Sequence, residues 1–209
     1  FGGSSKIPAQ SYEVNMQLAR VAAFIDKVGA NKYHVAGNSM GGLIAGLLAA
    51  QYPDRVLSLA LLDTYGIGNR EKSELVRELE KGVNPMIVEK PEDYDRLLNF
   101  MFVKPPSIPG PVKKYLAAKS IESKEFNKKV FNEVQGDTLL EEKMAGIKAR
   151  TLVIWGDTDR VFPVSSARVI EQGIPASKII IMKNCGHLPM TERPEEASGY
   201  YFDFVNAAR

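Results

Sequence analysis

The most constraining feature of the chain is a serine flanked by small residues at the junction of a strand-like and a helix-like segment. Gly37-Asn38-Ser39-Met40-Gly41 follows a short β-branched stretch at 32–36 and precedes a strongly apolar stretch at 43–52, which Pro53 ends. The G-x-S-x-G spacing is typical of a sharp strand-to-helix turn that exposes a nucleophilic serine. The pentapeptide also fits an ordinary glycine-rich turn, so its setting carries the prediction. That setting indicates an α/β fold.

The pattern of the remaining segments predicts a mostly parallel sheet. Residues 56–62 are continuously apolar, as expected of a strand buried on both faces, and strand patterns return at 151–155 and 178–182. Apolar residues recur at helical spacing between 12 and 28, and helices are predicted near 164–172 and 194–207. The alternation of strands and helices favours parallel strands with helices on the faces of the sheet.

A charged helical segment interrupts this alternation. Residues 66–147 lack convincing strands and contain four predicted helices, separated by proline and glycine breaks, at 70–81, 91–102, 111–120 and 123–134. We therefore predict three parts: a first half of the core at 1–65, an inserted helical cap at 66–147 and a second half of the core at 148–209. Four strands under such a cap would leave an apolar sheet edge uncovered, so we expect N-terminal strands of the fold to lie outside this chain.

Bulk composition excludes several classes of protein. The 209 residues carry 27 basic and 25 acidic side chains, a net charge of +2, without a basic block, which argues against nucleic-acid binding. Cys185 is the single cysteine, so no internal disulfide is expected. Apolar runs fall far short of the roughly 20 residues that span a bilayer. We expect a soluble fragment, and its location stays open between the cytoplasm and the cell envelope.

A serine nucleophile needs a base, and the chain offers two histidines. His34 lies within the first strand, five residues before Ser39, where its side chain cannot fold back to the turn. We predict a structural role for it. His187 follows the last predicted strand, which places it at the carboxyl edge of the sheet, where open α/β folds bind ligands. His187 is therefore the predicted base.

Three aspartates compete to orient this base. Asp157 and Asp159 lie in the loop after the strand at 151–155, and Asp63 directly follows the strand at 56–62. All three remain candidates from position alone; the family resemblance given below favours Asp159, in which case Asp157 is expected to accept hydrogen bonds from loop backbone. The chain order Ser39, Asp159, His187 suits an α/β fold. No cluster of histidines and cysteines suggests a metal, and no cofactor is expected.

Three motifs together resemble the α/β-hydrolase superfamily. They are Gly-Asn-Ser-Met-Gly-Gly at 37–42, Trp-Gly-Asp-Thr-Asp-Arg-Val-Phe-Pro at 155–163 and Asn-Cys-Gly-His-Leu-Pro-Met-Thr-Glu-Arg-Pro at 184–194. The branch that is most similar comprises the monoacylglycerol lipases and related bacterial lipases and esterases. The resemblance implies an α/β-hydrolase fold with Ser39, Asp159 and His187 as catalytic triad, and it supports Asp159 because the family's acid stands three residues past the glycine.

The resemblance also implies an oxyanion hole, of which the Met40 N–H would be one donor. Family members supply a second donor from a His-Gly segment, which we expect upstream of Phe1, because Phe1-Gly2-Gly3-Ser4-Ser5 is similar to a loop that follows it in the family. Losing one such donor typically costs about 10²–10³ in kcat. We therefore expect an upstream part of the same protein to complete the fold, and these 209 residues alone to be poorly active.

Taken together, the sequence predicts a serine hydrolase of lipid or other apolar esters. Phe100, Met101, Phe102 and Leu188 are candidate substrate-binding residues, and the apolar cap stretch that includes them could contact lipid or a membrane surface. The same stretch equally fits packing of the cap on the core. Two alternatives remain: a carbon–carbon bond hydrolase with the same triad, and a ligand-binding protein built on a hydrolase fold.

Overall fold

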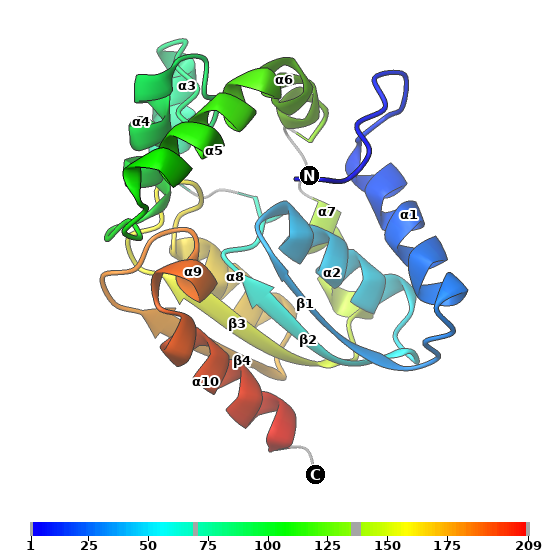
Figure 1. The fold of residues 1–209 in the computed structure, drawn as a ribbon. Helices are drawn as coiled ribbons and strands as arrows, with labels where there is room; N and C mark the ends of the chain where they lie inside the picture. The colour runs from blue at the N-terminus through cyan, green and yellow to red at the C-terminus, as the bar shows by residue number, and fades with distance from the viewer. Residues whose placement is uncertain (1, 69–70, 135–138, 208–209) are drawn as a thin grey trace.

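A four-stranded parallel sheet forms the centre of the protein (Figure 1). The computed structural model describes residues 2–68, 71–134 and 139–207. Its strands are β1 (Tyr33–Asn38), β2 (Val56–Leu62), β3 (Arg150–Gly156) and β4 (Ser177–Met182), side by side in the order β1-β2-β3-β4. All three pairings are parallel, which confirms the predicted fold class. The carboxyl ends of the strands therefore meet at one edge of the sheet.

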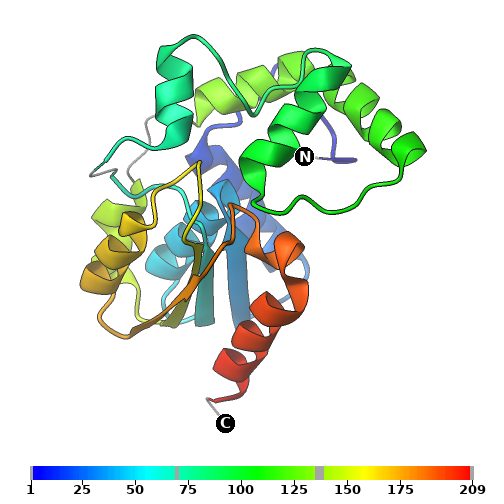
Figure 2. The ribbon, with the colours of Figure 1, turned by 90° about the vertical axis from the view of Figure 1, so that its left-hand side faces the viewer.

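Helices cover both faces of this sheet, as Figure 2 shows in a view along its side. One face packs against α1 (Val14–Lys27), α2 (Met40–Gln51), α7 (Leu139–Lys143) and α8 (Ser165–Gly173), and the other against α10 (Pro194–Asn206). Residues alternate between these layers along each strand: Leu59 and Leu61 face the first, whereas Ala60 faces the second. Both faces of β2 and β3 are thus largely buried, which explains why these strands are mostly apolar; Ser58 of β2 and Arg150 and Thr151 of β3 interrupt the pattern.

The cap helices lie over the carboxyl ends of the strands (Figures 1 and 2). They are α3 (Glu74–Glu80), α4 (Pro91–Met101), α5 (Gly110–Glu122) and α6 (Lys124–Glu133). Each matches one of the four predicted helices, with ends shifted by a few residues; the predicted start at position 70 lies outside the described residues. The boundaries proposed for the cap, 66 and 147, stay a prediction.

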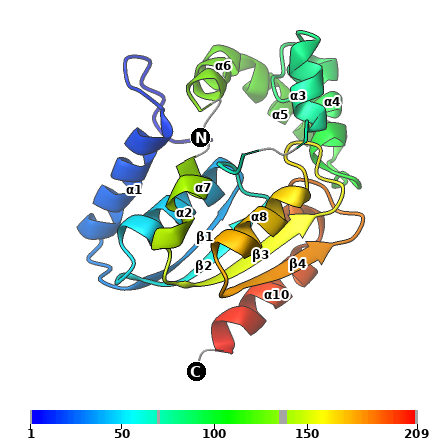
Figure 3. The same cartoon turned by 180° about the vertical axis from the view of Figure 1, so that it is seen from behind.

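Three short helical elements were not predicted: α7, the 3₁₀ turn Met144–Gly146, and α9 (Pro189–Glu192). None is long enough to show a helical period in the sequence. Helix α7 packs on the core, because Leu140 is fully buried and fills the space that a side chain at Gly46 of α2 would need. Seen from behind, α7 and α8 lie over the same face of the sheet (Figure 3). The last part of the predicted cap segment therefore contributes to the core.

Candidate active site

Ser39 occupies a strained turn between β1 and α2. Its backbone has φ 55° and ψ −124°, a conformation that costs a residue with a side chain about 1–3 kcal/mol. The turn is fixed by backbone hydrogen bonds, since the Ser39 N–H donates to the Leu62 carbonyl and the Ser39 carbonyl accepts from the Tyr65 N–H. These contacts attach the turn to the end of β2 and its following loop.

The two glycines on either side of the turn, Gly37 and Gly41, differ in the space around them. A Cβ atom at Gly37 would lie 2.1 Å from the Gly41 carbonyl oxygen, so only glycine fits there. A Cβ atom at Gly41 would meet no heavy atom within 4 Å in the described structure. The sequence pattern suggested that both positions must be small; within the described residues, crowding applies to Gly37 alone.

Helix α2 points its N-terminus at the turn. Met40 is its first residue, and N–H groups in the first turn of a helix have no acceptor inside the helix. The N-terminal end of a helix also favours negative charge. The helix is buried along most of its length, from Gly42 to Ala49, so it is held in a fixed direction. This arrangement suits the binding of an oxyanion beside Ser39.

Asp159 and His187 form a buried hydrogen-bonded pair. Their Oδ2 and Nδ1 atoms are 2.9 Å apart, and their side chains are 0% and 1% exposed. The other carboxylate oxygen of Asp159 accepts the N–H groups of Val161 and Phe162, at 2.7 and 3.2 Å. Asp159 is thus an acceptor on both oxygens, which assigns the proton of the neutral imidazole to Nδ1. The Nε2 atom is left as the proton acceptor.

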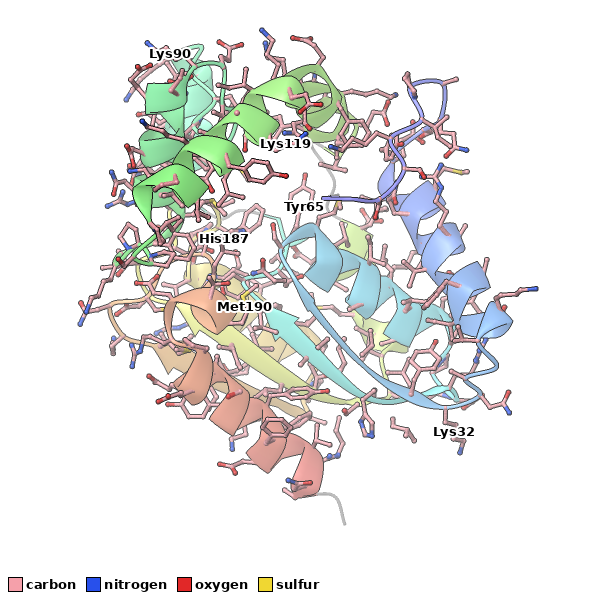
Figure 4. The ribbon with its side chains drawn as sticks, viewed as in Figure 1. Lys32, Tyr65, Lys90, Lys119, His187 and Met190 are labelled. Carbon is pink, nitrogen blue, oxygen red and sulfur yellow. The ribbon has the colours of Figure 1, made fainter. Side chains whose placement is uncertain are left out.

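Three elements hold the loop that carries His187. The His187 carbonyl accepts a hydrogen bond of 3.0 Å from the Asn38 side chain in β1, and its N–H donates to the Met101 carbonyl at the end of α4, at 2.9 Å. In α9, Glu192 accepts the Gly186 N–H at 2.9 Å. Figure 4 shows His187 where the cap meets the carboxyl edge of the sheet. The loop is therefore clamped between core and cap.

The link between His187 and Ser39 is not closed in this structure. His187 Nε2 is buried and has no hydrogen-bond partner among the described residues. Ser39 nevertheless directly follows Asn38, whose side chain bonds to the His187 carbonyl. Catalytic hydrogen bonds are often long before substrate binds and tighten in the complex. The structure thus shows two of the three predicted residues bonded and places the third next to a residue that contacts the base.

Asp63, one of the competing acids, lies beside this pair. It is fully buried at the end of β2, and its Oδ1 atom accepts the Gly156 N–H at 2.9 Å. Its Oδ2 atom has no hydrogen-bond partner among the described residues. A carboxylate oxygen of Asp63, one of Asp159 and a ring nitrogen of His187 all lie within 4.8 Å of one another. Burial, then the charge of Asp159, raises the pKa of Asp63 well above its usual range.

The two remaining titratable residues singled out in the sequence have structural contacts. Asp157 Oδ1 accepts the Asn184 N–H at 2.8 Å, which confirms its expected bond to loop backbone. Burial opposes the ionised form, but the hydrogen bonds from Thr158 and Asn184 lower the pKa of Asp157. His34 pairs with Ser58 of β2, at 2.7 Å between Nδ1 and Oγ, in keeping with a structural role.

The cluster of Asp63, Asp159 and His187 is poorly suited to a metal ion. His187 Nδ1 and Asp159 Oδ2 bond to each other, and Asp159 Oδ1 accepts two N–H groups. Asp63 Oδ1 accepts the Gly156 N–H, so one carboxylate oxygen remains for a cation. Structural zinc sites use four protein ligands and catalytic ones three. The donor set fits proton transfer better.

The candidate substrate-binding residues lie in the contact between cap and core. Phe100, Met101 and Phe102 are 6%, 9% and 6% exposed and form a cluster with Leu75 of α3 and Val161 of the acid loop. Leu188 packs against the same cluster. This burial is what the packing interpretation expects; contact with substrate stays a prediction.

The aromatic ring of Phe162, in the acid loop, contacts His187. The Phe162 ring meets the imidazole edge to face, with centroids 5.4 Å apart, and stacks on Tyr65 at 5.2 Å.

A cleft of about 540 Å³ lies between the elbow end of β1 and helices α9 and α10. Asn38, Leu62, Met190 and Tyr201 are among the residues that line it. The surroundings of the site are thus mostly apolar.

Known proteins resemble the chain along nearly its whole length. A family model described as alpha/beta hydrolase fold matches residues 1–90. Lipase 1 of Psychrobacter immobilis is 33% identical over 207 residues, which cover 98% of this chain and 65% of that protein. Monoacylglycerol lipase abhd6-B of Xenopus laevis is 32% identical over 220 residues, which cover 98% and 64%. The chain therefore spans just under two thirds of the length of these curated relatives.

A solved structure also matches nearly the whole chain. A crystal structure described as a membrane phospholipase A and bacterial virulence factor matches with a TM-score of 0.96 and 46% identity, over 99% of this chain and 67% of that one. Among the described residues of the present chain, no helix has the length and apolar character needed to cross a membrane.

Proposed function

This chain belongs to the α/β-hydrolase family, and from that membership we propose that it is part of a serine hydrolase that cleaves carboxylic esters of lipids or other apolar acyl compounds. The observation that carries the proposal is the buried Asp159–His187 hydrogen bond beside the strained turn at Ser39. Strain that aims a hydroxyl out of a turn, next to an oriented imidazole, is the arrangement that acyl transfer to serine requires.

The proposed reaction proceeds through an acyl-enzyme. Ser39 Oγ attacks the ester carbonyl while His187 Nε2 takes its proton, and the Asp159 carboxylate stabilises the resulting imidazolium. The Met40 N–H donates to the oxyanion. His187 then protonates the leaving alcohol, and a water molecule repeats the sequence on the acyl-serine. Each proton moves between Nε2 and an oxygen, while Nδ1 stays bonded to Asp159.

Lipid-like substrates are supported by two observations. The relatives carry the names lipase, monoacylglycerol lipase and phospholipase A. The cap also has exposed apolar side chains, at Val103, Val112 and Tyr115, which are 41%, 47% and 61% exposed. We infer that the cap segment governs substrate choice and contacts the lipid phase, with Phe100, Met101, Phe102 and Leu188 near the acyl chain.

The test is activity-based labelling combined with an ester series, carried out on the protein as it is naturally expressed. A fluorophosphonate should label the wild type at Ser39, and Ser39→Ala should lose labelling and lower kcat by about 10⁶. Nitrophenyl esters and monoacylglycerols of increasing chain length then report the acyl preference.

The chain offers a matched control in its second serine–histidine pair. Ser58 bonds to His34 within the sheet, and no acid is bonded to that histidine in the described structure. Ser58→Ala should keep full labelling at Ser39. Labelling that survives Ser39→Ala, or a wild type that binds apolar esters without cleaving them, would contradict the proposal and favour a ligand-binding protein.

A further inference from the structure

We propose that Asp63 is a positioning residue of this site: a carboxylic acid that keeps its proton at neutral pH and donates it to the Asp159 carboxylate. Its effect on catalysis rests on the proposed function, whereas its protonation does not. The inference starts from two buried carboxyl groups within 4.8 Å of each other, one of which has an oxygen without a partner among the described residues.

The backbone fixes Asp63 against the end of β3. Its N–H donates to the Ile154 carbonyl at 3.0 Å, its φ is 41°, and its Oδ1 atom accepts the Gly156 N–H. Gly156 ends β3 and begins the loop that carries Asp159. A left-handed φ is uncommon for a residue other than glycine, although aspartate tolerates it better than most. The side chain is therefore held toward the acid loop and cannot turn to solvent.

The distribution of hydrogen-bond donors decides which carboxyl group holds the proton. Asp159 accepts three N–H groups, from His187, Val161 and Phe162, whereas Asp63 accepts one, from Gly156. Hydrogen bonds to a carboxylate stabilise its ionised form, and two like charges close together in a buried site cannot both be stable. The proton of the pair is therefore assigned to Asp63.

The other charged groups near Asp63 also favour its protonated form. After burial and the charge of Asp159, the carboxylate of Glu192 in α9 further raises the pKa of Asp63, and only the Gly156 N–H opposes these effects. The neighbouring thiol of Cys185 responds to the same surroundings: burial, then Glu192 and Asp63, raise its pKa to about 12.

Protonation of Asp63 gives its Oδ2 atom a hydrogen-bond partner and reduces the negative charge next to His187. A carboxylic acid has an O–H donor, so Asp63 Oδ2 then gains a partner in the Asp159 carboxylate. The pair carries one negative charge instead of two. His187 therefore faces a single negative charge, which orients its ring. Asp63 acts through Asp159 and does not touch the substrate.

The first test detects the protonated state of Asp63 from the pH dependence of folding stability, and it needs no assay of activity. Asp63 is ionised above about pH 4 in the unfolded chain but neutral when folded, so its stabilising contribution is lost as pH rises toward the folded pKa. In Asp63→Asn this loss is absent. The unfolding constant of the wild type, divided by that of Asp63→Asn at the same pH, should therefore rise about tenfold per pH unit above about pH 4. Urea unfolding of both proteins at a series of pH values measures this ratio.

Asp157→Asn is the matched control, because it removes an aspartate from the adjacent loop whose pKa is lowered on folding. Its contribution is present above about pH 4 and lost as pH falls, so the ratio of its unfolding constant to that of the wild type should be flat above that pH. A flat ratio for Asp63→Asn as well would overturn the proposal.

A measurement on the wild type covers the case in which Asp63→Asn does not fold. A protonated buried carboxyl group gives an infrared carbonyl band separate from that of carboxylates, and the band should be present at neutral pH. Its absence would contradict a neutral Asp63. This result, like the stability ratio, is independent of whether the protein hydrolyses esters.

The second test addresses the positioning role through kinetics. The amide of Asp63→Asn can donate to Asp159 and accept from Gly156, whereas Asp63→Ala removes the donor to Asp159 and leaves the Gly156 N–H without this acceptor. Asp63→Ala should therefore lower kcat about tenfold or more below Asp63→Asn, with KM little changed. The acidic limb of the kcat/KM profile should stay in place in Asp63→Asn. A shift of that limb downward by about one pH unit would show that an ionised Asp63 had been removed, and would refute the proposal.

Discussion

At the scale of single residues, the candidate site combines two residues with left-handed backbone conformations, Ser39 and Asp63, with the hydrogen-bonded pair of Asp159 and His187. Ser39 is held at φ 55° by bonds to Leu62 and Tyr65, and Asp63 is held at φ 41° by a bond to Ile154. Both residues stand at the carboxyl ends of neighbouring strands. Strain and burial are concentrated there because the surrounding sheet is rigid enough to maintain them.

The strain at Ser39 makes a prediction about stability. Replacement by glycine relieves the left-handed conformation, whereas replacement by alanine removes the hydroxyl and keeps the strain. We expect Ser39→Gly to have a free energy of unfolding about 1 kcal/mol higher than Ser39→Ala, measured by urea unfolding.

Ser198 supplies the control for this comparison, because it is exposed within helix α10. There the order should reverse, with alanine about 1 kcal/mol more stable than glycine. If Ser39→Ala were as stable as Ser39→Gly, the turn would not be strained in solution.

At the scale of elements, the site depends on contacts between loops that are far apart in the sequence. Glu192 of α9 accepts the Gly186 N–H of the histidine loop and the Lys104 N–H that follows α4, at 2.9 and 2.8 Å. A Cβ atom at Gly186 would lie 2.5 Å from the Met101 carbonyl oxygen, so the two segments are in close contact. The cap is thereby connected to the loop that carries His187, which gives cap residues a route to influence the proposed reaction.

The elbow yields a second prediction, in which two glycines of one motif respond differently. Gly37→Ala would place a methyl group 2.1 Å from the backbone of Gly41, and the turn would have to open. We expect a loss of about 1–3 kcal/mol in the free energy of unfolding and slow fluorophosphonate labelling. Gly41→Ala, with open space at its Cβ position, should change the free energy of unfolding by less than about 0.5 kcal/mol. Equal losses in the two variants would show that the motif needs both glycines for another reason.

The elements show what the sequence reveals and what it does not. Strand β2 has the predicted bounds, 56–62, because six of its seven residues are apolar and only Ser58 interrupts the run. Strand β1 was predicted to end at 36 but continues to Asn38. The first two residues of the serine motif, Gly37 and Asn38, still pair with Leu61 and Leu62 of β2. Helices α7 and α9, with five and four residues, are too short for a periodic signal.

The site was predictable to a similar extent. Its motifs predict Ser39, Asp159 and His187 as the site residues, and the structure has a hydrogen bond between the last two; their catalytic role stays a prediction. The meeting of Asp63 with Asp159 depends on the pairing of β2 with β3 and on the Gly156 N–H, which no local pattern encodes. The sequence named Asp63 only as a rival acid, whereas the coordinates bring both acids to one histidine.

At the scale of the whole molecule, the sheet is covered unevenly. Among the described strands, β1 pairs only with β2, so its other edge is open. On the α10 side, the cleft of about 540 Å³ reaches the face of β1 at Ala36 and Gly37. His34 and Ala36, which alternate on that strand, are exposed. An open strand edge beside an apolar cleft favours pairing with another chain.

The third prediction follows from this uneven cover. Residues 1–209 expressed alone should self-associate as their concentration rises, because the edge and the cleft are both available to a second copy. A lysine on an edge strand opposes such pairing, so Ala36→Lys should shift the sedimentation profile toward monomer. Ala118→Lys adds the same charge at an exposed alanine of helix α5, far along the chain in the cap, and should leave association unchanged. A wild-type chain that sediments as monomer at every concentration would show that the edge of β1 is protected in a way that the described residues do not reveal.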